Sequence, residues 1–302
     1  IALSYHPLFT TEVSVGNSSA MNTAKFHFKG RTAHAGGDPH NGRSALDAVE
    51  LMNVGANYLR EHVTSDVRIH YTITEGGTAP NIVPDKACVW YYVRAMRREA
   101  VEDVYARLVK VAKGAAMMTE TEVEIEFLGG CYNTMANMVL SELVHKNMGA
   151  VPQDPWTPEE IQMAREMSEA SGQNWENVRR AYNLGENDTL SSTVQPIKFI
   201  DQYGSTDVGD VSWVCPTAQV NTACYASGTP GHSWQLVAQG KAPVAHAAML
   251  QAGRVMAGTA IDLFESPELL EKAKAEHAAR VGDGYVCPIP AGVKPRPMGA
   301  KK

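Results

Sequence analysis

The chain has 302 residues, of which 44% are hydrophobic and 20% charged, a balance that excludes a disordered segment and favours two globular domains. A formal net charge of -6, with no Lys- or Arg-rich run, argues against a nucleic-acid-binding surface. No window holds about 18 uninterrupted apolar residues, so the sequence predicts no transmembrane helix.

The first residues have the pattern of a buried strand. Residues 1–5 are mostly apolar, begin without Met and lack the features of a signal sequence. We therefore expect a longer polypeptide from which an N-terminal segment is missing here. The five cysteines are scattered and form no Cys-x-x-Cys pair, which predicts reduced thiols in a cytoplasmic protein.

Residues 21–130 are expected to form one compact domain. Alternating apolar and polar residues predict four strands, and apolar residues at helical spacing predict two helices. In chain order these elements are a strand at 25–29, a helix from Ser44, strands at 67–74 and 86–95, a helix around 101–115 and a strand at 122–127. This order is ferredoxin-like, with an antiparallel sheet and both helices on one face.

Residues 1–20 and 131–302 are expected to form a second, discontinuous domain of α/β type. It mixes helices with apolar strands, and its glycine-rich motifs lie in loops. The expected elements are helices at 137–148, 158–183 and 244–264, a loop at 184–202 and a strand near 219–225.

His34 lies in a glycine-rich segment between the first strand and the first helix of the 21–130 domain. Gly36, Gly37 and Gly42 are expected to permit backbone conformations that a Cβ would forbid. A histidine at such a turn can donate a hydrogen bond or exchange a proton near neutral pH. The loop by itself leaves a functional histidine and a solvated one equally open.

Four further residues are candidates for chemistry. His6 and His232 lie at strand–loop junctions, where neutral imidazoles can bind Zn or Mn, although no His-Glu-x-x-His pair supports a metal site by spacing. Asn81 is at a predicted loop tip, where a residue capping its own turn is the alternative. Arg94 ends a strand, where its guanidinium can hold a carboxylate or form a surface salt bridge.

Together these segments resemble the M20 family of metallopeptidases and amidohydrolases. The resemblance is clearest for the lid, or dimerisation, domain of that family, and residues 205–213 and 228–235 are similar to its aminobenzoyl-glutamate utilisation branch. The lid motifs are Phe28-x-Gly30-x-x-x-His34-Ala35, Gly42-Arg43-Ser44-Ala45-Leu46-Asp47-Ala48, Asn81-Ile82-Val83-Pro84-Asp85 and Val93-Arg94.

The resemblance implies a zinc-peptidase-like α/β catalytic domain into which residues 21–130 are inserted as the lid. It implies two divalent metal ions, Zn or Mn, with His6 and His232 as ligands, and a glutamate that acts as base on a bridging water. His34 would reach into the partner subunit's site and stabilise the oxyanion. Asn81 and Arg94 would hold the substrate's carboxylate or the oxyanion. No role is assigned to Asp207 or Asp210.

The implied function is hydrolysis of an N-acyl amide, with p-aminobenzoyl-glutamate cleaved to p-aminobenzoate and glutamate. The alternatives are another M20 aminoacylase, carboxypeptidase or dipeptidase, or a non-catalytic dimerising fragment. The family's Cys/His-Gly-His motif and Glu-Glu pair have no counterpart here and would precede Ile1, so the chain by itself is expected to be inactive. The expected partners are an N-acyl amino acid and, through the lid, an identical or homologous subunit; neither a nucleic acid nor a membrane is expected.

Overall fold

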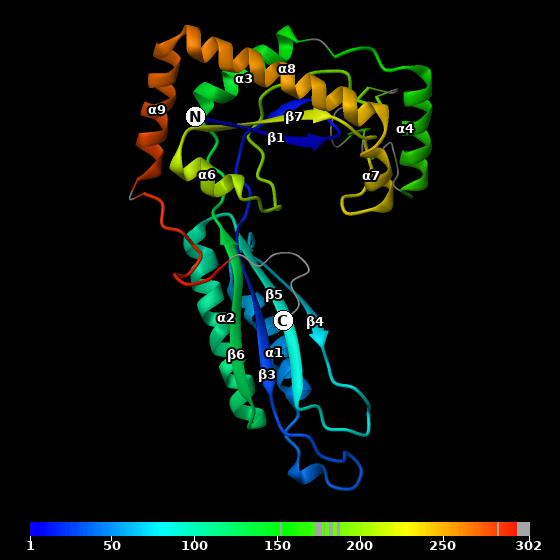
Figure 1. Ribbon diagram of the computed structural model, residues 1–302, viewed down its shortest axis with the longest axis vertical. Coiled ribbons are helices and arrows are strands. Elements are labelled where there is room, and N and C mark those ends of the chain that lie inside the picture. Colours follow the sequence, from blue (N-terminus) through cyan, green and yellow to red (C-terminus); the bar gives the residue numbers. More distant parts are fainter. Residues whose placement is uncertain are drawn as a thin grey trace. The chain divides into compact units, whose positions relative to one another are not determined.

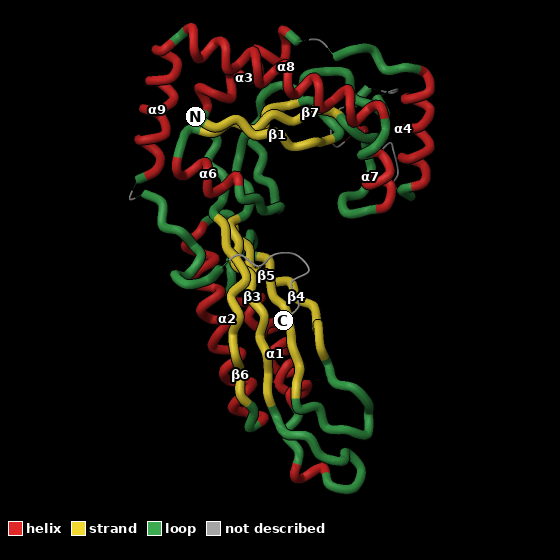
Figure 2. Tube along the Cα trace, viewed as in Figure 1, coloured by secondary structure: helices red, strands yellow, loops and turns green. Residues whose placement is uncertain are grey.

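The computed structural model describes residues 1–151, 153–172, 177, 179–180, 184–185, 188–282 and 284–294. The chain divides into two compact units. Unit 1 comprises residues 1–16, 135–201 and 211–284, and unit 2 comprises residues 17–134, 202–210 and those from 285 on. Figure 1 labels the elements and Figure 2 separates helices, strands and loops. The mixed α/β class predicted from the sequence is confirmed.

Unit 2 contains a four-stranded antiparallel sheet in the order β4-β5-β3-β6. Helices α1 and α2 pack on one face of this sheet, and the chain order β3-α1-β4-β5-α2-β6 is the predicted ferredoxin-like one (Figure 1). The bounds are β3 Ala20–Lys29, α1 Ala45–Leu59, β4 Arg68–Glu75, β5 Lys86–Ala95, α2 Arg98–Thr119 and β6 Glu122–Cys131, with short 3-10 turns η1 Pro39–Asn41 and η2 Arg60–His62.

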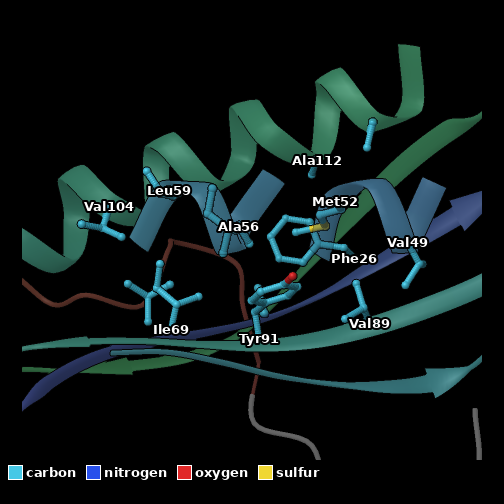
Figure 3. Close-up of a cluster of buried hydrophobic side chains, with 14 of the residues drawn as sticks. Phe26, Val49, Met52, Ala56, Leu59, Ile69, Val89, Tyr91, Val104 and Ala112 are labelled. Carbon is cyan, nitrogen blue, oxygen red and sulfur yellow. The ribbon is translucent and has the colours of Figure 1, made fainter. Parts of the chain in front are cut away.

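The core of unit 2 lies between the helices and the sheet. Figure 3 shows Phe26 and Tyr91 of the sheet packed against Met52 of α1, and all three side chains are fully buried. The Tyr91 hydroxyl donates to Asn53 Oδ1 at 2.6 Å, so the one polar atom that the Tyr91 side chain brings into the core is satisfied. Burial raises the pKa of Tyr91, which keeps this hydroxyl protonated as a donor.

Local sequence explains how α1 begins. The Ser44 side chain accepts a hydrogen bond from the Asp47 backbone N–H at 3.1 Å, as expected for an N-cap. Strand β3 begins at Ala20, earlier than the predicted residue 25, and Ala20, Asn22 and Ala24 continue its buried face. The sequence did not indicate this part of the strand because it lacks the alternation of apolar and polar residues.

Unit 1 contains a three-stranded sheet in the order β1-β7-β2, in which β1 is parallel and β2 antiparallel to β7. Its buried core joins this sheet to helices α3, α8 and α9. The bounds are β1 Ala2–Leu8, β2 Glu12–Ser14, α3 Met138–Ala150, α4 Pro158–Ala170, β7 Thr217–Ala223, α7 Trp234–Gln239, α8 Pro243–Glu265 and α9 Pro267–Val281. Helix α6, Val208–Val214, contains residues of both units.

Several expectations for unit 1 need correction. The helix expected over 158–183 is α4, which ends at Ala170, and much of the remainder lies outside the described residues. Helices α6 and α9 were not predicted. Strand β1 does not end at Tyr5 but continues through His6 and Pro7 to Leu8, because parallel pairing with β7 extends to Ala223. Among the described residues, no helix is long and apolar enough to cross a membrane.

Candidate functional site

The loop that carries His34 is fixed to the loop that carries Asn81. The Ala35 N–H donates to the Asn81 carbonyl at 2.9 Å, and the Val83 N–H donates to the Ala33 carbonyl at 3.0 Å. Two polar side chains that are 47 positions apart in the sequence are thereby presented, both accessible to solvent, at the end of unit 2 where β3 ends and β5 begins. This pairing of backbone groups gives the loops a rigid scaffold.

The ring of His34 is oriented by its own loop. Its Nδ1 accepts hydrogen bonds from the backbone N–H groups of Gly36, at 3.2 Å, and Gly37, at 2.9 Å. Because an accepting Nδ1 carries no proton, the proton of the neutral imidazole is on Nε2. The loop thus presents an outward Nε2–H donor at its exposed surface.

The glycines of this loop are needed for a different reason from the one predicted. None of Gly36, Gly37 and Gly42 has a positive φ, so none adopts a conformation forbidden to other residues. A Cβ on Gly42 would instead lie 2.9 Å from both methyl groups of Val83. At Gly36 the nearest atom would be His34 Cε1 at 3.5 Å, an ordinary contact. Close approach, not backbone freedom, therefore explains Gly42.

Arg94 lies at the opposite end of the sheet from His34 and Asn81. It is eight positions along β5 from Lys86, which corresponds to about 26 Å of extended strand. Arg94 Nη1 donates to the Tyr203 carbonyl at 3.4 Å, and its guanidinium lies over the Tyr92 ring. Within one chain, the structure therefore joins His34 to Asn81 and separates both from Arg94.

His6 and His232 belong to unit 1. The Nδ1 of His6 is 2.9 Å from the Pro7 carbonyl, which fixes the proton on Nδ1 and leaves Nε2 as a free lone pair, the form that binds a metal. His232 is exposed and has a φ of 58°, in the left-handed region that few residues other than glycine adopt. Among the described residues no group of three or more His, Cys, Asp and Glu side chains can hold a metal ion.

The motif around Asp207 and Asp210 has a structural component. The Asp210 carboxylate accepts from the Tyr285 hydroxyl at 3.0 Å and from the Tyr132 N–H at 3.4 Å. Burial raises the pKa of Asp210, although these hydrogen bonds oppose the shift. Asp210 therefore links Tyr285 to Tyr132, which directly follows β6.

Two residues that the sequence did not single out, Arg68 and Tyr203, lie beside Arg94. Arg68 is directly opposite Arg94 in the register of β4 and β5, and its guanidinium lies over the Tyr203 ring. The sequence placed Arg68 in the strand predicted over 67–74 but did not indicate a functional role for it, and no sequence pattern pointed to Tyr203.

The fold of unit 2 and its lid motifs are typical of the M20 dimerisation domain, and comparison with known proteins gives the same class. Residues 18–117 match the peptidase dimerisation domain of the M20 family. The chain is a relative of the M20 peptidases and amidohydrolases, and the resemblance inferred from its motifs is confirmed.

Individual relatives narrow this class. The chain is 39% identical to one subunit of the p-aminobenzoyl-glutamate hydrolase of Escherichia coli, over 98% of this chain and 65% of that protein. It is 29% identical to the other named subunit of the same hydrolase, over 39% of this chain and 27% of that protein. An aminobenzoyl-glutamate utilization protein from Klebsiella pneumoniae has a similar fold, with a TM-score of 0.54 and 17% identity over 86% of this chain and 54% of that one. The chain spans less than two thirds of the length of each.

Proposed function

We propose that this chain forms part of a metal-dependent amidohydrolase that cleaves an N-acyl amide, with p-aminobenzoyl-glutamate as the first substrate to test. In this proposal unit 1 is a portion of the catalytic domain and residues 21–130 are its lid. The observation that carries the proposal is the state of His34, an accessible imidazole that two backbone N–H groups hold with its proton on Nε2.

Each lid residue then has a definite task. The Nε2–H of His34 donates to the oxyanion that forms as water attacks the amide carbonyl, and the Asn81 amide lies in the adjoining loop to assist it. Arg94 binds the carboxylate of the amino-acid part of the substrate, for which its planar guanidinium is suited. Because Arg94 is about 26 Å along β5 from Lys86, which lies at the end of the sheet that carries the other two, one substrate meets all three only when two subunits contribute.

A divalent metal would supply the activated water, with His6 and His232 as ligands. His6 has the tautomer required of a ligand, since its Nε2 lone pair is free. Two histidines do not make a divalent-metal centre, however, and the described residues contain no group of three suitable side chains. In this proposal the remaining ligands and the general base come from outside the residues that the structure describes.

The surface of unit 2 supports a subunit partner. Leu51, Val54 and Tyr58 form an exposed apolar stripe along α1, and Tyr58 is 72% exposed. Strand β4 is an edge of the sheet and exposes Tyr71 and Ile73 on the side of the helices. Arg60, just after α1, lies over the Tyr71 ring, so the apolar stripe of α1 and the exposed edge strand β4 lie next to each other. We propose that a second copy, or a homologous subunit, pairs through this surface.

The test is hydrolysis by the complete protein loaded with Zn or Mn. Release of p-aminobenzoate from p-aminobenzoyl-glutamate supports the proposal, whereas faster cleavage of acetylated amino acids or dipeptides assigns the chain to another M20 substrate class. If the complete protein binds no metal and cleaves none of these compounds, a non-catalytic dimerising role replaces the enzymatic one.

A further inference from the structure

The sheet of unit 2 has a second face, opposite the one that α1 and α2 cover. Alternation along the strands places Arg68 and His70 of β4 on this face, together with Trp90, Tyr92 and Arg94 of β5. In the register of the two strands Arg68 lies opposite Arg94, and His70 lies opposite Tyr92. Two guanidinium groups therefore project side by side from neighbouring strands.

Such a pair is unfavourable without an anion, because like charges directly opposite one another destabilise a sheet. Among the described residues neither Arg68 nor Arg94 forms an ion pair with a carboxylate. Both instead use backbone carbonyls: Arg68 Nη1 donates to Ser65, at 2.6 Å, and to Val67, at 2.9 Å, while Arg94 donates to Tyr203. These neutral acceptors orient the guanidiniums but leave the charge uncompensated.

Tyr203 holds the two guanidiniums in one place. Its ring is 4.8 Å from Arg68 Cζ, and its carbonyl accepts from Arg94. Arg94 Nε is buried and has no acceptor among the described residues, which is uncommon for a charged group. With Nη1 committed to Tyr203 and Nε buried, Nη2 is the group of this guanidinium that can donate a charge-assisted hydrogen bond to a carboxylate.

The positive charge of the arginine pair affects the pKa of the neighbouring His70. Partial burial lowers the pKa of His70 first, and the charges of Arg94, Arg60 and Arg68 lower it further. His70 is therefore an internal probe, because any anion that binds to the arginine pair will raise its pKa.

We propose that Arg68 and Arg94 together form a site for a dicarboxylate, with Arg94 taking the α-carboxylate of an N-acyl amino acid and Arg68 its acidic side chain. This inference rests on the proposed function and adds a determinant of specificity to it. Arg68 makes the enzyme prefer N-acyl-glutamate over N-acyl-glutamine, whose neutral side chain leaves the Arg68 charge unpaired.

The first test needs no catalysis. The pKa of His70 is followed by NMR in this chain with and without N-acetyl-glutamate, N-acetyl-glutamine or inorganic phosphate. We expect N-acetyl-glutamate to raise it most, and Arg68→Gln both to raise it in the free chain and to weaken N-acetyl-glutamate binding roughly 10–100-fold. Lys25→Gln is the matched control, since Lys25 is a cation on β3 that lies over Trp90 and away from the pair.

Two outcomes of this test would overturn the proposal. One is equal binding of N-acetyl-glutamate and N-acetyl-glutamine by the wild-type chain. The other is a response to phosphate as large as that to N-acetyl-glutamate, which would make the pair a general anion site. Arg68→Lys keeps the charge but loses the planar group, so binding between that of the wild type and Arg68→Gln is expected if the variants fold.

The second test measures kcat and KM for both N-acyl substrates in the complete enzyme. Arg68→Gln is expected to raise KM for the glutamate substrate roughly 10–100-fold and to leave kcat for this substrate nearly unchanged. The KM for the glutamine substrate should change little. An equal loss on both substrates would overturn the role of Arg68 in specificity. If the wild type cleaves no amide, the proposed function fails, and the His70 titration still decides whether the dicarboxylate site exists.

Discussion

Two loops of this molecule present a histidine close to glycines, and they do so in opposite ways. In the loop of unit 2, His34 has ordinary backbone geometry and its Nδ1 accepts from two backbone N–H groups. In the loop of unit 1, His232 has a φ of 58°, and its ring makes no hydrogen bond with another described residue. Local bonds, such as Ser233 Oγ to the Pro230 carbonyl, hold the backbone of that loop.

The difference indicates two kinds of chemistry. A histidine with one nitrogen accepting hydrogen bonds has its tautomer set and is ready to donate from the other nitrogen. A histidine in a strained backbone conformation with a free ring is suited to an additional partner, because strain of this kind persists only where the surroundings or the function require it. We predict from this contrast that His34 donates to the reacting group and that His232 is a ligand, and four experiments test these two roles.

The largest effect is expected at His34. In the complete enzyme His34→Ala should lower kcat roughly 10²–10³-fold, the scale of losing one oxyanion donor. Steady-state kinetics measures it, with His40→Ala as the control, because His40 is an exposed histidine of the same loop. An unchanged kcat in His34→Ala would return His34 to the solvated-loop interpretation.

The second largest effect is expected on metal binding, which should depend on the histidine loop of unit 1 and not on that of unit 2. In the complete protein His232→Ala should weaken metal affinity by at least about 10-fold, since even outer-shell partners of a metal contribute 10–100-fold. Metal content after dialysis measures this effect, and His34→Ala should retain its metal. Full metal occupancy in His232→Ala removes this residue from the ligands.

The stability of the unit 2 loop should depend on space rather than on backbone freedom. Gly42→Ala should lower the free energy of unfolding by about 1–3 kcal/mol, because the new methyl group meets Val83 at 2.9 Å. Gly36→Ala meets no atom closer than 3.5 Å and should change stability far less. Denaturant unfolding compares the two, and Val83→Ala should restore much of the Gly42→Ala loss. Equal effects of the two glycine substitutions would contradict this explanation.

The smallest effect is expected from relieving the backbone of the unit 1 loop. His232→Gly should stabilise the metal-free protein by about 1 kcal/mol, since glycine adopts a positive φ without a steric penalty. Thermal unfolding without metal measures it, and His246→Gly, in α8, is a control that should destabilise. A loss of stability in His232→Gly would mean that the ring, not the backbone, holds this loop.

Much of unit 2 was predictable because its signals are local. Alternation along β5 predicted the observed strand, 86–95, and Ser44 marked the start of α1 through its hydrogen bond to Asp47. Unit 1 was harder to predict. Helix α9 is polar enough to resemble a surface segment, and β1 extends past Pro7 only because it pairs with β7, which is more than 200 residues away.

The candidate site divides in the same way. The residue types and spacing of His34, Asn81 and Arg94 were enough to suggest the family, whereas their roles stay predictions. Arg68 and Tyr203 were missed because the contact that matters is between strands and between distant segments, and no local pattern records it.

The order of elements in unit 2, the glycine-rich histidine loops and the motifs of the M20 family could all be derived from the sequence, since each depends on residues close together in the chain. The folded chain was needed to show that His34 and Asn81 lie at one end of a sheet and Arg94 at the other, and that Arg68 lies opposite Arg94. The physical reason is register: hydrogen bonding between strands decides which distant residues become neighbours, and a shift by one residue would move every side chain to the other face.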